Sequence, residues 1–305
     1  MNTDTLAPSD GQDEGLTLSA SPDIDLSIGG SILEETKNRL MDRYGDQIKT
    51  ITLDRVVIGI FYTGVQLSDG SAGICFTPIK AIPESVCCPS SARAMPKAGK
   101  LKGMKVTDVF KYLTQPAPIK RAIAIATLNA LSDGIWRNNP EEGAGRYRID
   151  EGDDIFSFVH LEDVHKAVVI GALIPVIKSF KEKEIPYRIA ELDIRTLKAE
   201  EIPFFVSQED LPMELATADM VIISGTTLLN DTLEGILQAC NTASKIFLIG
   251  PTATMLPESF FKRKVSVLAG NRVVDSEKIL DVLIEGGSGY HFYGDSSRKV
   301  MIIKE

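Results

Sequence analysis

Cysteine is scarce in this chain of 305 residues, which contains only Cys75, Cys87, Cys88 and Cys240. Neither their number nor their spacing forms the disulfide framework of a small secreted domain. No apolar run reaches the 18 residues that a membrane-spanning helix requires. No basic residue precedes Lys37, so we expect no secretory signal. These absences favour a cytoplasmic protein that does not enter a membrane.

Basic residues are fewer than acidic ones, 33 against 42, and the net charge is −9. This surplus of negative charge disfavours nucleic acids and anionic membranes as partners. The hydrophobic and charged fractions, 44% and 25%, are typical of a globular protein. Because the chain is longer than one hydrophobic core usually organises, we expect two domains.

The sequence also lacks the common nucleotide-binding and hydrolase motifs. After the apolar run AVVIG, only Gly171 stands where a dinucleotide fingerprint needs three spaced glycines. The segment GPTATMLP lacks the Gly-Lys-Ser/Thr end of a phosphate-binding loop, and no G-x-S-x-G motif occurs. Nicotinamide, flavin and nucleoside triphosphate cofactors are therefore not expected. Whether the chain is an enzyme stays open.

The first half of the chain has the pattern of an α+β domain. Residues 1–30 carry six acidic and no basic side chains, which predicts a disordered acidic tail. Within residues 31–132 we expect a helix at SILEETKNRLMDRYG, and then TITLDRVVIGIFYTGVQL pairing with SAGICFTP as a hairpin. Two further helices, KVTDVFKYL and PIKRAIAIATLNAL, complete this domain.

The second half has a different pattern, which begins after a linker at residues 133–154 that is rich in Gly, Asn and charge. Within residues 155–305, the short apolar runs are AVVIG, PYRIAELD, ADMVIIS, KIFLIG, VSVLAG and KVMIIKE. Plausible helices separate the first five. Alternating strands and helices predict an α/β domain with a doubly wound, mostly parallel sheet.

Two hydroxyl-rich loops directly follow buried strands. The first is GTTLLNDT, beginning at Gly225, and the second is GPTAT, beginning at Gly250. Ligands of open parallel sheets bind beyond the carboxyl ends of the strands, so these loops are candidate ligand contacts. Helix capping is the alternative, because Asp231 and Glu234 have the spacing of a capping box. Both carboxylates would place negative charge at a helix start and disfavour a phosphate there.

Other segments offer weaker candidates for ligand or metal contacts. In EGGSGYHF, Gly286 fits a helix C-cap, while the additional glycines also fit a ligand-facing loop. Oxygen ligands for a hard cation are available near predicted element ends, with capping and surface solvation as the alternative. These carboxylates are Glu191, Asp219, Asp275 and Glu285. Either Cys87 or Cys88 offers a thiolate, although buried, unreactive thiols are the simpler interpretation.

The series GTTLLNDT, IGPTATMLPESFF, LAGNRVVDSEKIL and EGGSGYHF resembles a bacterial and archaeal family of unknown function. Its members are described as "putative heavy-metal chelation" proteins, and AIAIATLNAL resembles their companion domain. The resemblance implies a domain like the enolase N-terminal domain followed by a Rossmann-like domain. It also implies a cleft between them that binds a heavy metal or a metal complex, with a link to metal-tetrapyrroles and anaerobic metabolism.

The family motifs carry over onto individual residues of this chain. As ligand contacts the resemblance implies Asn129, Gly225, Thr226, Thr227, Asn230, Thr232, Gly250, Pro251, Thr252, Gly286 and Gly287, and as metal ligands Asp275 and Glu285. The chain departs from the family with Asp231 in place of Gly, with Ser224 in place of Thr, and with no aromatic residue or His at Gly171–Leu173.

Three functions are therefore weighed. The first is binding of a heavy metal, such as a transition-metal ion, or of a metal complex between the two domains. The second is an enzyme or carrier for a small polar organic ligand without metal. The third is a non-catalytic interaction protein. An assembly of identical copies stays open.

Overall fold

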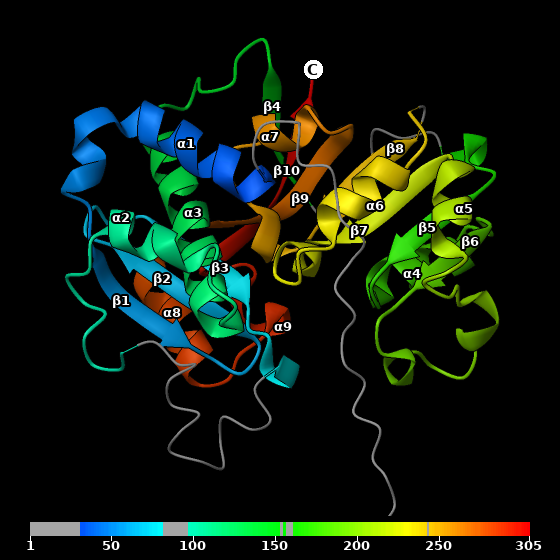
Figure 1. Ribbon diagram of the computed structural model, residues 1–305, viewed down its shortest axis with the longest axis horizontal. Helices are drawn as coiled ribbons and strands as arrows, with labels where there is room; N and C mark the ends of the chain where they lie inside the picture. Colours follow the sequence, from blue (N-terminus) through cyan, green and yellow to red (C-terminus); the bar gives the residue numbers. More distant parts are fainter. Residues whose placement is uncertain (1–30, 82–96, 153–154, 157–160, 243) are drawn as a thin grey trace, which may run out of the picture.

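A computed structural model describes residues 31–81, 97–152, 155–156, 161–242 and 244–305. These residues form a three-stranded antiparallel sheet and a seven-stranded, mostly parallel sheet, with helices packed on both (Figure 1). The expected mixed α/β fold class is thereby confirmed. The expected tail, residues 1–30, lies outside the described residues, as do Cys87 and Cys88.

The elements have the following bounds. The small sheet consists of β1 (Leu53–Ile58), β2 (Tyr62–Leu67) and β3 (Ala72–Phe76). The large sheet consists of β4 (Tyr147–Glu151), β5 (Ala167–Ile170), β6 (Tyr187–Ala190), β7 (Met220–Ser224), β8 (Lys245–Ile249), β9 (Val265–Val273) and β10 (Ser297–Lys304). The α-helices are α1 (Ile32–Tyr44), α2 (Val106–Val109), α3 (Pro118–Asn138), α4 (Ile174–Glu182), α5 (Leu211–Ala216), α6 (Leu233–Ala239), α7 (Glu258–Phe261), α8 (Ser276–Ile284) and α9 (Gly289–Phe292). Two short 3-10 helices matter for the site, η9 (Gly225–Leu228) and η10 (Pro251–Ala253).

The large sheet has the strand order β4-β10-β9-β8-β7-β5-β6. The strands from β5 to β9 are parallel, whereas β10 and β4 run antiparallel at one edge. Alternate residues of each strand enter different cores: Val168 and Ile170 face one core, and Ala167 and Val169 the other. From β5 the chain crosses to β6 on one side, and it then returns across β5 to form β7 on the other side. The strand order therefore reverses between β5 and β7. Such a reversal opens a crevice at the carboxyl ends of the strands.

The small sheet differs from the expected hairpin. The apolar run expected to form one strand turns at Gly59 and forms both β1 and β2, and β2 then pairs with β3. The amide of Gly59 donates to the carbonyl of Tyr62 and closes this turn. A side chain is not tolerated at Gly59, because its Cβ would lie 2.5 Å from the carbonyl oxygen of Leu283 in α8. The expected turn at Asp69 and Gly70 is present between β2 and β3.

The two halves of the chain share their cores. Helix α3 packs on the small sheet, and α8, which comes from the C-terminal half, contacts β1 and β2 (Figure 1). One hydrophobic core joins Ile125 of α3 with Ile236 of α6 and Leu248 of β8. Within the expected linker, residues 133–138 continue α3, and residues 147–151 form β4. The domain boundaries at 132 and 155 stay a prediction.

No helix in the described part of the chain combines the length and the apolar character needed to cross a membrane. The most extended apolar helix, α3, is interrupted by charged residues and belongs to the shared core.

Candidate functional site

A cavity of about 510 Å³ opens at the carboxyl ends of β5, β6 and β7, where the strand order reverses. Helices α5 and α6, which contact each other, contribute one wall with Leu211, Leu215 and Ile236. The loop after β7 contributes hydroxyl and amide groups. Ligand pockets typically have such a volume, an apolar lining and a few polar groups. All lining residues fall between 170 and 239, so this cavity lies within the C-terminal half and not in a cleft between the halves.

The loop after β7 supplies the polar wall. Ser224 organises its first turn: its hydroxyl accepts from the amide of Thr226, and its carbonyl accepts from the hydroxyl of Thr227 at 2.8 Å. The side-chain oxygen of Asn230 accepts from the hydroxyl of Thr232 at 2.8 Å. These four expected contacts, Thr226, Thr227, Asn230 and Thr232, all line the cavity. Gly225 lies buried at the start of the loop.

The alternative interpretation, a capping box at Asp231 and Glu234, is wrong. Helix α6 begins after Thr232, and no side chain caps it. Asp231 instead forms an ion pair with Arg121 of α3, and Glu234 accepts from the amide of Ile32 and pairs with Arg263. Because partners outside the loop bind both carboxylates, neither is free to cap its own helix.

The charge around the cavity still disfavours an anionic ligand, for a different reason than expected. Its lining includes Glu191 and Asp231 but, within the described chain, no Lys, Arg or His. Backbone amides of Ala172, Leu192 and Asp193 donate to the Glu191 carboxylate, at 2.7, 2.8 and 3.3 Å. The cavity therefore has negative and neutral polar groups, and it suits an uncharged or cationic ligand.

The second expected loop packs beside the first but not in the same cavity. Gly250 has φ +125° and ψ 158°, a conformation that only glycine adopts readily. Thr252 is buried, and its hydroxyl accepts from the amide of Phe76 at 3.0 Å. Asn129, in the middle of α3, donates to the carbonyls of Ile74, Pro251 and Thr252 at 2.8, 3.1 and 3.1 Å. These residues connect the small sheet, α3 and the end of β8.

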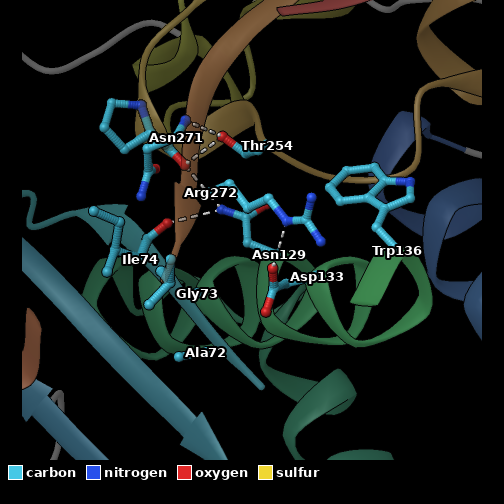
Figure 2. A pocket seen from close by; sticks show the side chains of 11 residues that line it. Ala72, Gly73, Ile74, Asn129, Asp133, Trp136, Thr254, Asn271 and Arg272 are labelled. Atoms are coloured by element: carbon cyan, nitrogen blue, oxygen red, sulfur yellow. Dashed lines mark hydrogen bonds and ion pairs between the residues drawn. The ribbon is translucent and has the colours of Figure 1, made fainter. Parts of the chain in front are cut away.

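Figure 2 shows a small cavity beside Asn129, between α3 and β9. Its volume of about 10 Å³ is close to the minimum for one water molecule. The buried side-chain oxygen of Asn129 has no hydrogen-bond partner among the described residues, and the buried carboxylate of Asp133 has only long ion pairs, with Arg272 at 3.7 Å and Arg137 at 3.9 Å. Burial raises the pKa of Asp133 to about 6, although Arg137, Arg272 and the backbone of Ala72 lower it. Only a very small ligand fits at this position.

The expected metal ligands Asp275 and Glu285 lie at opposite ends of α8. They are ten residues apart, about 15 Å along a helix, so the two carboxylates cannot share one ion. The Asp275 carboxylate accepts from the amide of Lys278 at 2.9 Å and caps α8. Gly286 has φ +77°, and the amide of Gly287 donates to the carbonyl of Val282, which ends the helix. The described structure does not bring this segment to the cavity.

Replacing Asp275 with alanine is expected to lower the free energy of unfolding by about 1 kcal/mol, because α8 loses its N-cap. Chemical denaturation checks the loss, with Glu285→Ala as the control at the other helix end. Elemental analysis of both variants should find the metal content of the unmodified chain. Loss of metal at unchanged stability would instead assign Asp275 a role as a ligand.

Within the described residues, no group of three or more His, Cys, Asp or Glu is placed to hold a metal ion. The described cysteines, Cys75 and Cys240, are buried and free. Burial raises the pKa of both thiols, that of Cys240 to about 11, so both are protonated at neutral pH. A protonated thiol is a poor metal ligand. The described lining of the cavity contains neither thiol nor imidazole, the groups that bind soft heavy metals.

Sequence reasoning missed the apolar wall of the cavity and Arg121. The wall consists of residues from α5, α6 and β6, which become neighbours only after folding. Arg121 gave one local signal, a charged side chain within the apolar segment PIKRAIAIATLNAL. Its partner, 110 residues away, carries no mark of the pairing in the sequence.

Comparisons with solved structures show the fold. A protein of unknown function from Pyrococcus horikoshii, of the DUF364 family, aligns with a TM-score of 0.69 and 21% identity over 90% of this chain and all of that one. A DUF364 protein of unknown function from Desulfitobacterium hafniense aligns with a TM-score of 0.63 and 17% identity over 88% of this chain and 99% of that one.

Comparisons of sequence identify the family. An uncharacterized protein of Methanocaldococcus jannaschii is 28% identical over 191 residues, which are 61% of this chain and 67% of that one. The DUF4213 model matches residues 41–132 and the DUF364 model residues 154–302, and both are described as "putative heavy-metal chelation". This chain therefore belongs to the family of proteins described as "putative heavy-metal chelation".

Proposed function

We propose that this chain binds a metal held in an organic complex, with the apolar body of the complex in the 510 Å³ cavity. The observation that carries the proposal is the combination of a ligand-sized cavity at the strand reversal with a lining that, among the described residues, includes no soft metal ligand. The family description supports a metal as cargo. A complex reconciles the two, because its organic part supplies the metal ligands. Among the metal-tetrapyrroles that the family resemblance implies, those with uncharged side chains belong to this class.

The second candidate is a carrier or enzyme for a small organic ligand without metal. The same cavity supports it, since the hydroxyl and amide groups after β7 suit a polar organic molecule. The two candidates differ in whether a metal accompanies the organic ligand. The resemblance implies a site between the halves, whereas the cavity proposed here lies within the C-terminal half. Arg121 is a contact through which the N-terminal half reaches the cavity loop.

Filling the cavity tests both candidates. Ala239 lines the cavity from α6, so Ala239→Trp places an indole in the ligand space. Ala216→Trp is the matched control, at an exposed position of α5 outside the lining. Untagged protein is purified without metal resin, and bound compounds are measured by mass spectrometry and elemental analysis. We expect Ala239→Trp to retain at least about tenfold less organic compound than the control, at an unchanged thermal midpoint.

The composition of the bound material decides between the candidates. Metal that falls in proportion to the organic compound supports the metal complex, and an organic compound without metal supports the second candidate. Stoichiometric metal with no organic compound, unaffected by Ala239→Trp, would contradict the proposal and indicate an ion site elsewhere in the chain.

A further inference from the structure

Arg121 holds the loop that forms the polar wall of the cavity, although it does not line the cavity itself. From the first turn of α3, its Nε donates to the carbonyl of Leu228 at 3.2 Å. Its Nη2 and Nη1 donate to the two carboxylate oxygens of Asp231, at 2.6 and 3.3 Å. The side chain of Arg121 is 14% exposed, whereas that of Asp231 is 70% exposed. The largely buried guanidinium of Arg121 thus holds the exposed carboxylate of Asp231 in place.

The supported loop has a backbone that needs support. Asp231 has φ +63°, in the left-handed region that few residues other than glycine adopt. Aspartate tolerates this region better than most residues, but it also brings a negative charge to the cavity rim. Asn230 and Thr232, on either side of it, both line the cavity. Any shift of this turn therefore changes the ligand wall.

The pairing also decides the charge that a ligand meets. Arg121 lies on the other side of the loop, beside Leu228 and Leu233 in a separate small cavity. It therefore offsets the charge of Asp231 without offering a positive group to the ligand. The remaining carboxylate, Glu191, receives three backbone hydrogen bonds. The rim at Asp231 is left close to neutral.

We propose that Arg121 is a positioning and specificity-determining residue that shifts the preference of this cavity from cationic toward uncharged ligands. The inference rests on the proposed function, because it assumes that the cavity binds an organic body. Removing Arg121 exposes an unpaired carboxylate at the rim and frees the turn at Asp231. Removing the carboxylate alone leaves an unpaired Arg121 and changes the preference in the opposite direction.

Two probes with the same apolar body isolate the effect of charge. Adamantanemethanol is neutral, and adamantanemethylamine is a cation at pH 7.5. Their dissociation constants are measured by calorimetry at low salt for the unmodified chain and for Arg121→Met, Asp231→Asn and the double variant. In Arg121→Met the affinity for the amine should rise about three- to tenfold relative to that for the alcohol, and high salt should abolish this rise. In Asp231→Asn the amine should lose affinity relative to the alcohol. The double variant should have the same ratio of the two dissociation constants as the unmodified chain.

The matched control is Arg55→Met, because Arg55 also joins the halves, through Glu277 and Asp281 of α8 at 3.1 and 2.8 Å, away from the cavity. In this control the ratio of the dissociation constants of the two probes should stay unchanged. Hydrogen exchange at residues 226–232 should accelerate in Arg121→Met and not in the control.

Three results would overturn this inference. The first is an unchanged probe ratio in Arg121→Met, and the second is a shift of the same sign in Asp231→Asn. In both cases the proposed function would survive, provided that Ala239→Trp still weakens probe binding. The third is the absence of any probe binding that responds to Ala239→Trp, which would overturn the proposed site together with this inference.

Discussion

Replacing Asn129 with alanine is expected to lower the free energy of unfolding by about 3 kcal/mol or more. The side-chain amide of Asn129 is the common donor to three carbonyls, on β3 and on η10. Asn129 is 3% exposed, so water cannot readily replace these bonds. Each buried acceptor left without a partner costs about 1 to 3 kcal/mol. The loss should appear as a lower denaturant midpoint with an unchanged slope.

Asn139→Ala provides the control at the end of the same helix. Asn139 is exposed, and its amide contacts Glu142 at 3.3 Å, so its removal should change stability by less than about 0.5 kcal/mol. The structural role also predicts faster hydrogen exchange around Pro251–Ala253 in Asn129→Ala. A variant of full stability that has lost its bound compound would contradict this role and make Asn129 a direct ligand contact.

Replacing Asp133 with asparagine is expected to raise the free energy of unfolding at pH 7.5 by up to about 3 kcal/mol. Burial raises the pKa of Asp133 from 3.8 to about 6, so the ionised carboxylate destabilises the folded state at neutral pH. Asparagine keeps the shape of the side chain without the charge. Denaturant titrations of both proteins between pH 4 and pH 8 measure the difference.

The sign of the pH dependence follows from the raised pKa. Between about pH 4 and pH 6 the folded chain binds this proton more tightly than the unfolded chain, so Asp133 lowers stability as pH rises. The advantage of asparagine should therefore grow from near zero at pH 4 to its full value above pH 7. Asp295→Asn is the control, since Lys278 lowers the pKa of exposed Asp295 and gives a small effect of opposite sign. An advantage of Asp133→Asn that is constant with pH would contradict the assignment.

Most of the large sheet could be predicted from the sequence, because its strands are short and buried on both faces. Each of the six apolar runs of the C-terminal half became one strand, from β5 to β10. The strand β4 was not predicted, because YRIDE at the sheet edge is polar and becomes a strand by pairing with β10. The turn at Gly59 was not predicted either, for another reason. Its conformation depends on α8, more than 200 residues later.

The candidate site was predictable where it consists of one continuous segment. The loop from Thr226 to Thr232 follows a recognisable strand, and its hydroxyl residues, which line the cavity, are evident from the sequence. The role of Asp231 was not predictable, because it depends on Arg121 in another segment of the chain. The role of Asp275 and Glu285 as metal ligands stays a prediction. Both sit at helix ends, where a carboxylate suits a cap or solvent as well as a metal.

The most direct test of the account is a crystal structure of protein as purified, with anomalous data collected at the edges of the metals that elemental analysis finds. We expect continuous density for an organic body in the cavity, between α5, α6 and the loop after β7, with any anomalous peak inside that density. An anomalous peak bound by three or more protein side chains, with the cavity free of organic density, would contradict the central claim.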